Sequence, residues 1–224
     1  MQIYLEGIKV AFRGAPMTLG VCLCALLIGI VFGLIFALMR TSRNRVLVIL
    51  AKIYIEVVRG TPLIVQALIM AYGLPVFLQQ NGIDFSWREY MVVPAIIVCG
   101  LNSAAYMAEV IRGGIQSVDK GQIEAAHSLG MTKKQVMKLV VLPQAFKVAI
   151  PAFGNEFVTL IKETAVLSFV AVVEILRSAQ LWNASTFETF AAYTGAAVVY
   201  LCFTFPLSKV VAYIEKKLSW EGAI

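Results

Sequence analysis

The sequence predicts an all-α membrane protein with five transmembrane helices, preceded by a short amphipathic N-terminal helix. Of its 224 residues, 60% are apolar and only 14% are charged, and the mean hydropathy is +0.83. Soluble domains are usually about 45–50% apolar and about 25% charged. The apolar residues form long runs, and basic residues flank those runs. We therefore expect residues 1–224 to form a single transmembrane domain.

The first fourteen residues, MQIYLEGIKVAFRG, are predicted to form an amphipathic helix on the membrane surface. Polar and apolar residues alternate through this segment, as in helices that lie in the membrane interface. It is not a signal peptide, because no basic region leads into a short apolar core with a small-residue cleavage site.

Five apolar runs come close to the roughly 20 residues that a helix needs to cross a bilayer. The predicted spans are residues 15–39, 60–78, 91–110, 144–167 and 190–207. The fourth run is the least typical, because it carries several charges. Residues 172–189 are too polar and broken to span, so we expect a short helix and a loop at the surface. The four cysteines lie within apolar runs and are predicted to be packing residues rather than disulfide partners.

Basic residues are divided unequally between the two sides that five spans define. One side holds twelve: Arg40, Arg43, Arg45, Lys52, Arg112, Lys120, Lys133, Lys134, Lys138, Lys209, Lys216 and Lys217. The other side holds four: Lys9, Arg13, Arg88 and Arg177. The positive-inside rule then predicts an N-terminus outside the cell and a C-terminus in the cytoplasm. The net charge of +6 follows from these flanks and forms no basic stripe, so nucleic-acid binding is not predicted.

The segment 117–143 is a polar stretch between two apolar runs, on the predicted cytoplasmic side. Asp119 followed by Gln122, and Thr132 followed by Gln135, are two capping-box patterns that begin helices. Gly130 stands where a helix would end in a left-handed residue, and Pro143 is expected to close the second helix. The pattern predicts two short helices joined by a glycine turn. It fits either an ordinary loop or a rigid knob that docks against another protein.

This segment resembles the EAA loop of permease subunits of bacterial ABC importers. The family pattern is E-A-A, three residues, G, nine residues and I-x-L-P. The matching residues here are Glu124, Ala125, Ala126, Gly130, Val140, Leu142 and Pro143, with valine in place of isoleucine. Residues 54–66 and 102–122 resemble the subgroup that takes up polar amino acids, the histidine/glutamine/arginine permease type.

The resemblance implies a type I ABC importer permease with several partners. Residues 122–130 would be the coupling helix, with Gln122, Glu124, Ala125, Ala126, His127 and Gly130 in contact with a cytoplasmic ATPase. Two ATPase copies, a second permease (a homodimer or a heterodimer) and an extracytoplasmic amino-acid-binding protein would complete the complex in the cell membrane. No G-x-x-x-x-G-K-[ST] phosphate loop occurs in the sequence, so ATP and Mg²⁺ would bind the partner.

No catalytic or metal-binding residues are predicted, and we expect a transport subunit rather than an enzyme. His127 is the only histidine. No nucleophile or metal ligand accompanies it in the segment, so a contact role is favoured over catalysis.

Polar residues inside the apolar runs mark a candidate pathway, because such groups are costly in a bilayer. Asn102 and Ser103 lie within the third run. In the fourth, Glu156, Thr159 and Glu163 follow the i, i+3, i+7 spacing of one helix face, and Asn155 is adjacent. Hydrogen bonding between helices is the structural alternative for these residues. Glu109 and Arg112 are expected to pair with each other.

Acidic residues along a pathway favour cations, so we expect cargo that includes a basic amino acid: arginine, lysine or histidine. The competing function is an ATP-independent carrier or channel for small polar solutes, in which Glu156 and Glu163 would serve proton coupling. That alternative does not account for the double-capped segment 117–143.

Overall fold

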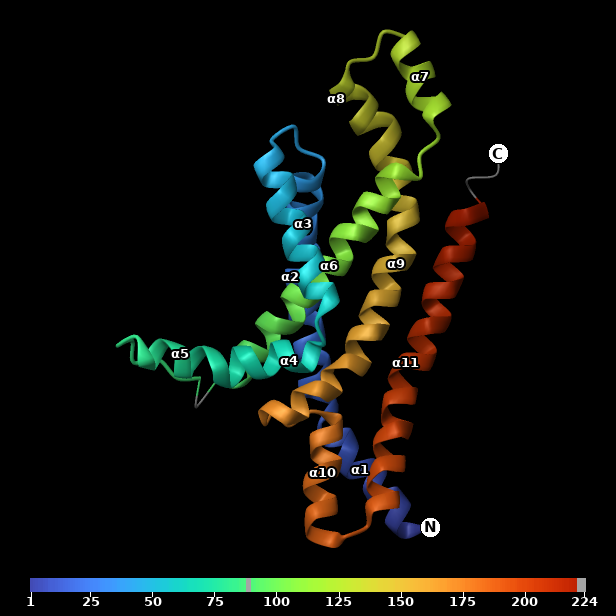
Figure 1. Ribbon diagram of the computed structural model, residues 1–224. Coiled ribbons are helices and arrows are strands. Elements are labelled where there is room, and N and C mark those ends of the chain that lie inside the picture. The colour runs from blue at the N-terminus through green and yellow to red at the C-terminus, as the bar shows by residue number, and fades with distance from the viewer. Residues whose placement is uncertain (88–89, 221–224) are drawn as a thin grey trace.

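The computed structural model describes residues 1–87 and 90–220, which are almost entirely helical (Figure 1). By length and composition, five helical segments could cross a membrane, as predicted: Gln2–Arg40, Leu63–Gln80, Val92–Gln116, Lys133–Val170 and Thr189–Leu218. Arg88, which the charge count used, lies outside the described residues. The all-helical class and the number of spans agree with the sequence, whereas several boundaries differ.

Helices α2 (Ala15–Arg40) and α6 (Val92–Gln116) form the tightest pair in the bundle. Glycines allow this approach: a Cβ atom added at Gly29 would lie 2.7 Å from Ser103 Oγ, and one at Gly33 would lie 2.5 Å from Met107 Cβ. Small residues at such contacts let two helix backbones pack closely where lipid supplies no hydrophobic drive between helices. The α2–α6 pair is therefore a rigid centre for the remaining helices.

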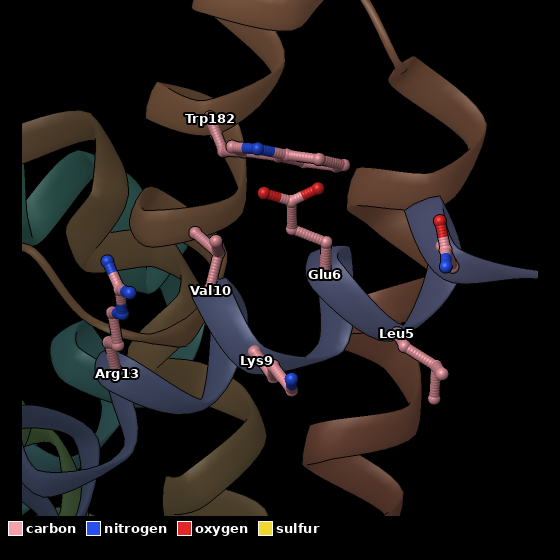
Figure 2. Close-up of a pocket in the computed structure, with 7 residues that line it drawn as sticks. Leu5, Glu6, Lys9, Val10, Arg13 and Trp182 are labelled. Atoms are coloured by element: carbon pink, nitrogen blue, oxygen red, sulfur yellow. The ribbon is translucent and has the colours of Figure 1, made fainter.

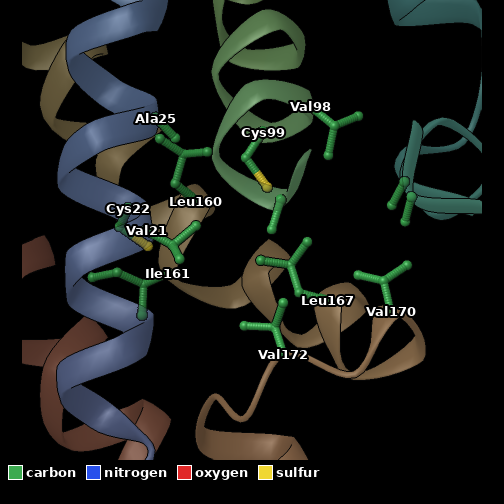
Figure 3. Close-up of a cluster of buried hydrophobic side chains, with 13 residues drawn as sticks. Val21, Cys22, Ala25, Val98, Cys99, Leu160, Ile161, Leu167, Val170 and Val172 are labelled. Atoms are coloured by element: carbon green, nitrogen blue, oxygen red, sulfur yellow. The ribbon is translucent and has the colours of Figure 1, made fainter. Parts of the chain in front are cut away.

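The main apolar core lies where α2 and α6 meet α9 (Leu142–Glu163) and the 3₁₀ helix η3 (Thr164–Val170). Figure 3 shows Val21 of α2, Leu160 of α9 and Leu167 of η3 turned toward this shared centre. Cys22 and Cys99 are buried in the same core, as expected of packing residues. Two other cysteines, Cys24 and Cys202, are exposed, contrary to that expectation. The helix η3 follows α9 directly in the chain, and its packing in this core holds it in place.

A helix that sequence analysis missed, α3 (Arg45–Gly60), precedes the second apolar run. Thr61 then adopts an extended conformation (φ −119°, ψ 143°), as residues before proline do, and Pro62 starts a new segment. That segment comprises α4 (Leu63–Leu68), a π-helical turn η1 (Ile69–Gly73) and α5 (Leu74–Gln80). Figure 1 shows α4 and α5 running across the direction of α2 and α6.

Pro143 does not close a helix, contrary to expectation. The chain passes from α8 (Lys133–Val136) through a π-helical turn, η2 (Met137–Val141), directly into α9. Pro143 is the second residue of α9, and the π-helical turn just before it lets the chain pass the proline without ending the helix. The fourth span is consequently longer than predicted.

Helix α10 (Ile175–Thr186) exists as predicted, but it is not a surface element throughout. Its residues Ile175, Ser178 and Ala179 are buried among α1 (Gln2–Arg13) and α11 (Thr189–Trp220). Helix α1 also packs on α11 rather than lying free: a Cβ atom added at Gly195 would sit 2.6 Å from the carbonyl carbon of Gly7. Figure 1 places α1, α10 and the start of α11 at the end of the molecule opposite α7 (Lys120–Ser128).

We predict that Gly195→Ala lowers the melting temperature of the purified protein, because the added methyl group meets the backbone of α1, which cannot move aside cheaply. Gly20→Ala is the matched control. Nothing lies within 4 Å of a Cβ atom there, and replacing a helical glycine should be neutral or stabilise by up to about 1 kcal/mol. Equal melting temperatures for the two variants would contradict the close α1–α11 contact.

Candidate functional site

Helix α7 projects at one end of the molecule (Figure 1). Asp119 fixes its N-terminus. The Asp119 carboxylate accepts hydrogen bonds from the backbone N–H groups of Gly121 (2.8 Å) and Gln122 (3.3 Å). Only this half of the predicted capping box forms. The Gln122 side chain instead accepts a 2.7 Å hydrogen bond from Gln144 Nε2 on α9. That bond ties the start of α7 to the helix below it.

The C-terminus of α7 ends in the predicted glycine turn. Gly130 is left-handed (φ +80°). The N–H of Met131 bonds to the carbonyl of Ala126 (3.2 Å) and that of Gly130 bonds to His127 (2.9 Å). These two bonds form a Schellman motif. The predicted second capping box, between Thr132 and Gln135, is also present, so the direction of α7 is fixed at both ends.

One face of α7 is buried and the other is open. Ala126 packs on a small apolar cluster with Val118, Val136 and Val141. The remaining predicted contact residues are exposed: Gln122, Glu124, Ala125, His127 and Gly130. The side chain of Leu129 is 83% exposed. Sequence reasoning overlooked Leu129, although its place directly before the glycine turn could have indicated it. The arrangement presents a stiff knob with one apolar tip.

Inside the bundle, Gln66 bridges three helices. Its Nε2 donates to the carbonyls of Val58 (2.8 Å) and Thr61 (3.1 Å), while its Oε1 accepts from Asn102 Nδ2 (3.1 Å). Val58 needs this donor because Pro62, four residues later, has no N–H to offer. Asn102 is buried and held by the Gln66 bond, so it is at least partly structural. Gln66 lies in the stretch 54–66, which resembles the polar amino-acid subgroup, but it was not among the predicted site residues.

Two of the predicted acidic residues face the α2–α6 pair. The buried Ser103 hydroxyl lies next to the Glu156 carboxylate without a hydrogen bond of ordinary geometry. Glu163 lies within electrostatic reach of Glu156 and of Cys99. Thr159, on the same helix face, is half-buried. The structure therefore brings Ser103 and Glu156 together, with Glu163 close by.

Asn155 does not join this group. It is exposed and lines a separate hollow with Lys147 of α9 and Glu215 of α11. Successive residues on a helix point about 100° apart, so adjacency to Glu156 in sequence does not place Asn155 on the same face.

A charged cluster closes the α7 end of the α2–α6 pair. Glu109 binds Arg112 at 2.5 Å, as predicted, and also lies 3.9 Å from Arg40 of α2. Arg59 of α3 stacks on the ring of Tyr106, with its guanidinium carbon 5.2 Å from the ring centre. The ion pairs of Glu109 and the stacking of Arg59 on Tyr106 link α2, α3 and α6.

Glu174 is a buried carboxylate that sequence analysis missed. It caps α10 by accepting from the N–H groups of Leu176 (2.9 Å) and Arg177 (2.6 Å), and it accepts from the Tyr200 hydroxyl of α11 (2.5 Å). The backbone of Glu174 also packs directly against Gly14, between α1 and α2. Burial raises the pKa of Glu174, although its hydrogen bonds from Tyr200 and the backbone act in the opposite direction.

A hollow of about 480 Å³ lies between α1 and α10, at the end opposite α7. Figure 2 shows the Glu6 carboxylate facing the ring of Trp182, with Lys9 and Arg13 on the same helix. None of the predicted substrate residues line it. Over residues 1–87 and 90–220, no group of three or more His, Cys, Asp or Glu side chains is placed to hold a metal ion.

Comparison with known proteins places this geometry in a family. Residues 29–220 match the family model of the binding-protein-dependent transport system inner membrane component. The chain is 38% identical to the nopaline transport system permease protein of Agrobacterium fabrum, over 96% of this chain and 90% of the relative. It is 37% identical to the putative glutamine transport system permease protein of Rickettsia bellii, over 92% and 91%.

A solved structure agrees with the fold. The crystal structure of an amino acid ABC transporter with histidines contains a chain with a TM-score of 0.86 and 38% identity, covering 95% of this chain and 96% of that one.

We predict that Glu174 makes stability depend on pH. Its pKa lies above the usual 4.5 in the folded protein, so the folded state holds the proton more tightly than the unfolded chain does. The resulting stabilisation is present below about pH 4.5 and is lost as the pH rises through the folded pKa. The melting temperature of the wild type should therefore fall relative to that of Glu174→Gln between about pH 4 and pH 8. The exposed Glu188→Gln should show no such trend.

Proposed function

The chain belongs to the family of binding-protein-dependent transport system inner membrane components, and from that premise we propose how its parts divide the work of import. It is the permease subunit of an amino-acid ABC importer with the type I fold, as its resemblance to the EAA-loop permeases predicted. The chain is not an enzyme, and ATP is hydrolysed by a separate subunit. Family membership sets aside the ATP-independent carrier.

Helix α7 is the coupling helix that docks in a groove of the ATPase. The single observation that carries this assignment is its doubly fixed geometry, with a Schellman turn at Gly130 and an exposed Leu129 at the tip. Helix α7 lies between α6 and α9 in the chain. Because its orientation is fixed, a movement of the ATPase that displaces α7 is passed on to α6 and α9. The side that bears α7 is then cytoplasmic, with the N-terminus outside, in agreement with the division of basic residues. Segment 117–143 is the coupling loop within a single transmembrane domain.

The cargo is a polar amino acid, and a basic one is favoured. The relatives are named for nopaline and glutamine, and the similar crystal structure contains histidines. Glu156 and Glu163, together with Ser103, Asn102 and Thr159, would line the pathway. Two neighbouring carboxylates with few compensating charges favour a substrate that brings positive charge, such as the α-ammonium group with a basic side chain.

The working complex contains two permease subunits, two ATPases carrying ATP and Mg²⁺, and an extracytoplasmic binding protein. Five spans in one chain enclose little space, so a twofold arrangement of permeases supplies the other wall of the pathway. Exposed apolar side chains on α11, including Leu201 and Phe205, leave ample surface for lipid or a second permease. Closure of the ATPases then switches the pathway between its two openings.

We predict that Gly130→Ala uncouples ATP hydrolysis from transport. A left-handed alanine costs about 1–2 kcal/mol and loosens the turn that sets the direction of α7. Gly82→Ala is the matched control, since Gly82 has the same φ of +80° and equal space around it, but lies in the loop after α5. Stimulation of ATPase activity by the loaded binding protein should fall several-fold in the first variant and persist in the second. Equal stimulation in both would contradict the coupling role.

We also predict that Glu156→Gln abolishes uptake of arginine by the reconstituted complex while leaving assembly with the ATPase intact. The amide keeps the size of the side chain and removes the negative charge. Glu6→Gln, an exposed acid on α1, should transport like the wild type. Undiminished arginine uptake by Glu156→Gln would remove Glu156 from the pathway.

A further inference from the structure

A second hollow, of about 470 Å³, lies at the end of the molecule opposite α7. It is lined by Tyr72 of η1, Ser168 and Ala171 at the end of η3, Arg177 and Gln180 of α10, and Tyr193 of α11. None of these residues belongs to the pathway described above. Aromatic side chains line the hollow together with a few polar groups from separate elements, as in many small-ligand sites.

Arg177 gives the hollow a cation without a carboxylate partner. The guanidinium is half-buried and donates through Nη1 to Gln180 Oε1 at 3.3 Å. No carboxylate of the described residues lies within ion-pair distance of it. The nearby Glu174 is already engaged by two backbone N–H groups and by Tyr200. Arg177 is therefore free to bind an anion, for which a guanidinium offers two parallel donors.

Ser168 adds an unsatisfied polar group to the same hollow. Its side chain is only 4% exposed, and its hydroxyl has no hydrogen-bond partner among the described residues. Buried hydroxyls are nearly always bonded in folded proteins, so an orphan one indicates that a ligand or water completes it. Ala171, three residues later, is held in a left-handed conformation (φ 61°) that non-glycine residues rarely adopt. Such strain is often found at binding sites.

The hollow lies close, along the chain, to the acidic residue Glu163. Ser168 follows Glu163 by five residues through the 3₁₀ helix η3. At about 2 Å of rise per residue, the two are roughly 10 Å apart. A substrate that entered from the end opposite α7 would meet Arg177 first and the carboxylates afterwards.

We infer that this hollow is an entrance site that binds the α-carboxylate of the amino acid on the extracytoplasmic side. Arg177 pairs with the carboxylate, and the hydroxyls of Ser168, Tyr72 and Tyr193 donate to it. Every amino acid has this group, so the site accepts glutamine and arginine alike and leaves discrimination by charge to Glu156 and Glu163. The inference rests on the proposed function, because it assumes amino-acid cargo and an outside location for this end.

The test is equilibrium binding of radiolabelled L-arginine and L-glutamine to the permease–ATPase complex in nanodiscs, without the binding protein. The variants are Arg177→Gln, Arg177→Lys and Ser168→Ala, with Arg13→Gln as a control cation at the same end. Arg177→Gln should weaken binding of both amino acids about tenfold or more, because a charge-assisted hydrogen bond is lost. Arg177→Lys should restore part of that loss, and Arg13→Gln should change nothing.

Two further readouts separate ligand binding from a structural role. The wild type should bind L-argininamide, which lacks the carboxylate, about tenfold more weakly than L-arginine, and Arg177→Gln should remove this preference. Ser168→Ala should weaken binding a few-fold without lowering the melting temperature, because the hydroxyl makes no bond in the empty site.

Equal affinity of the wild type and Arg177→Gln would overturn the entrance site while leaving the proposed function standing. So would loss of permease pairing or of binding-protein docking in Arg177→Gln with amino-acid binding unchanged, because the hollow would then be a protein interface. A wild-type complex that imports no amino acid with its binding protein and ATP would overturn both proposals.

Discussion

A backbone polar group inside a bilayer must find its partner within the protein, since lipid offers none and each unpaired group costs several kcal/mol. The structure depends on this constraint most clearly at Pro62, where α3 stops and α4 turns across the bundle. Gln66 pairs with the two carbonyls that the break exposes and passes its own oxygen to Asn102 of α6. One side chain thus makes the break tolerable and links it to the central helix pair. These hydrogen bonds of Gln66 allow α4 and α5 to run across the bundle.

Close packing between helices is the second feature that stabilises the bundle. Gly29 and Gly33 let α2 lie directly on α6, and Gly7 and Gly195 do the same for α1 and α11. Contacts this close leave no room for side-chain rearrangement, so movement between the two access states is expected at the joints rather than inside these pairs. The available joints are the break at Pro62, the π-helical turns η1 and η2, and the η3–α10 connection. Helix α7 reaches α9 through η2, and Gln144 fastens its start to α9. A push on α7 would therefore act first on α9, which carries Glu156 and Glu163.

The sequence alone predicted the features that depend on residues close together in the chain. The caps of α7, the left-handed Gly130 and the Glu109–Arg112 pair depend on residues within four positions of one another, and all but half of one capping box are present. The number of spans follows from composition. Helix limits were harder to predict, because the π-helical turn η2 carries the chain past Pro143, where the sequence predicted the end of a helix. Glu174 was missed because its partner Tyr200 and its neighbour Gly14 are far away in sequence. Asn155 lies apart from Glu156 because neighbouring residues on a helix point in different directions.

The charges along the molecule differ in how completely they are compensated, and that difference points to where a substrate acts. Glu109 is paired with Arg112 and lies near Arg40 at the α7 end, and Glu174 is satisfied by hydrogen bonds at the other. Such groups are occupied by the protein itself and hold helices together. Glu156 and Glu163 lie close to each other, and Arg177 has no carboxylate within reach among the described residues. Under the proposed assignment, a zwitterionic amino acid would offer its carboxylate to Arg177 and its ammonium group to Glu156 and Glu163. With its carboxylate held at Arg177, the amino acid would direct its ammonium group toward Glu163 and Glu156. An anion lacking an amine would gain the first contact and be repelled at the second.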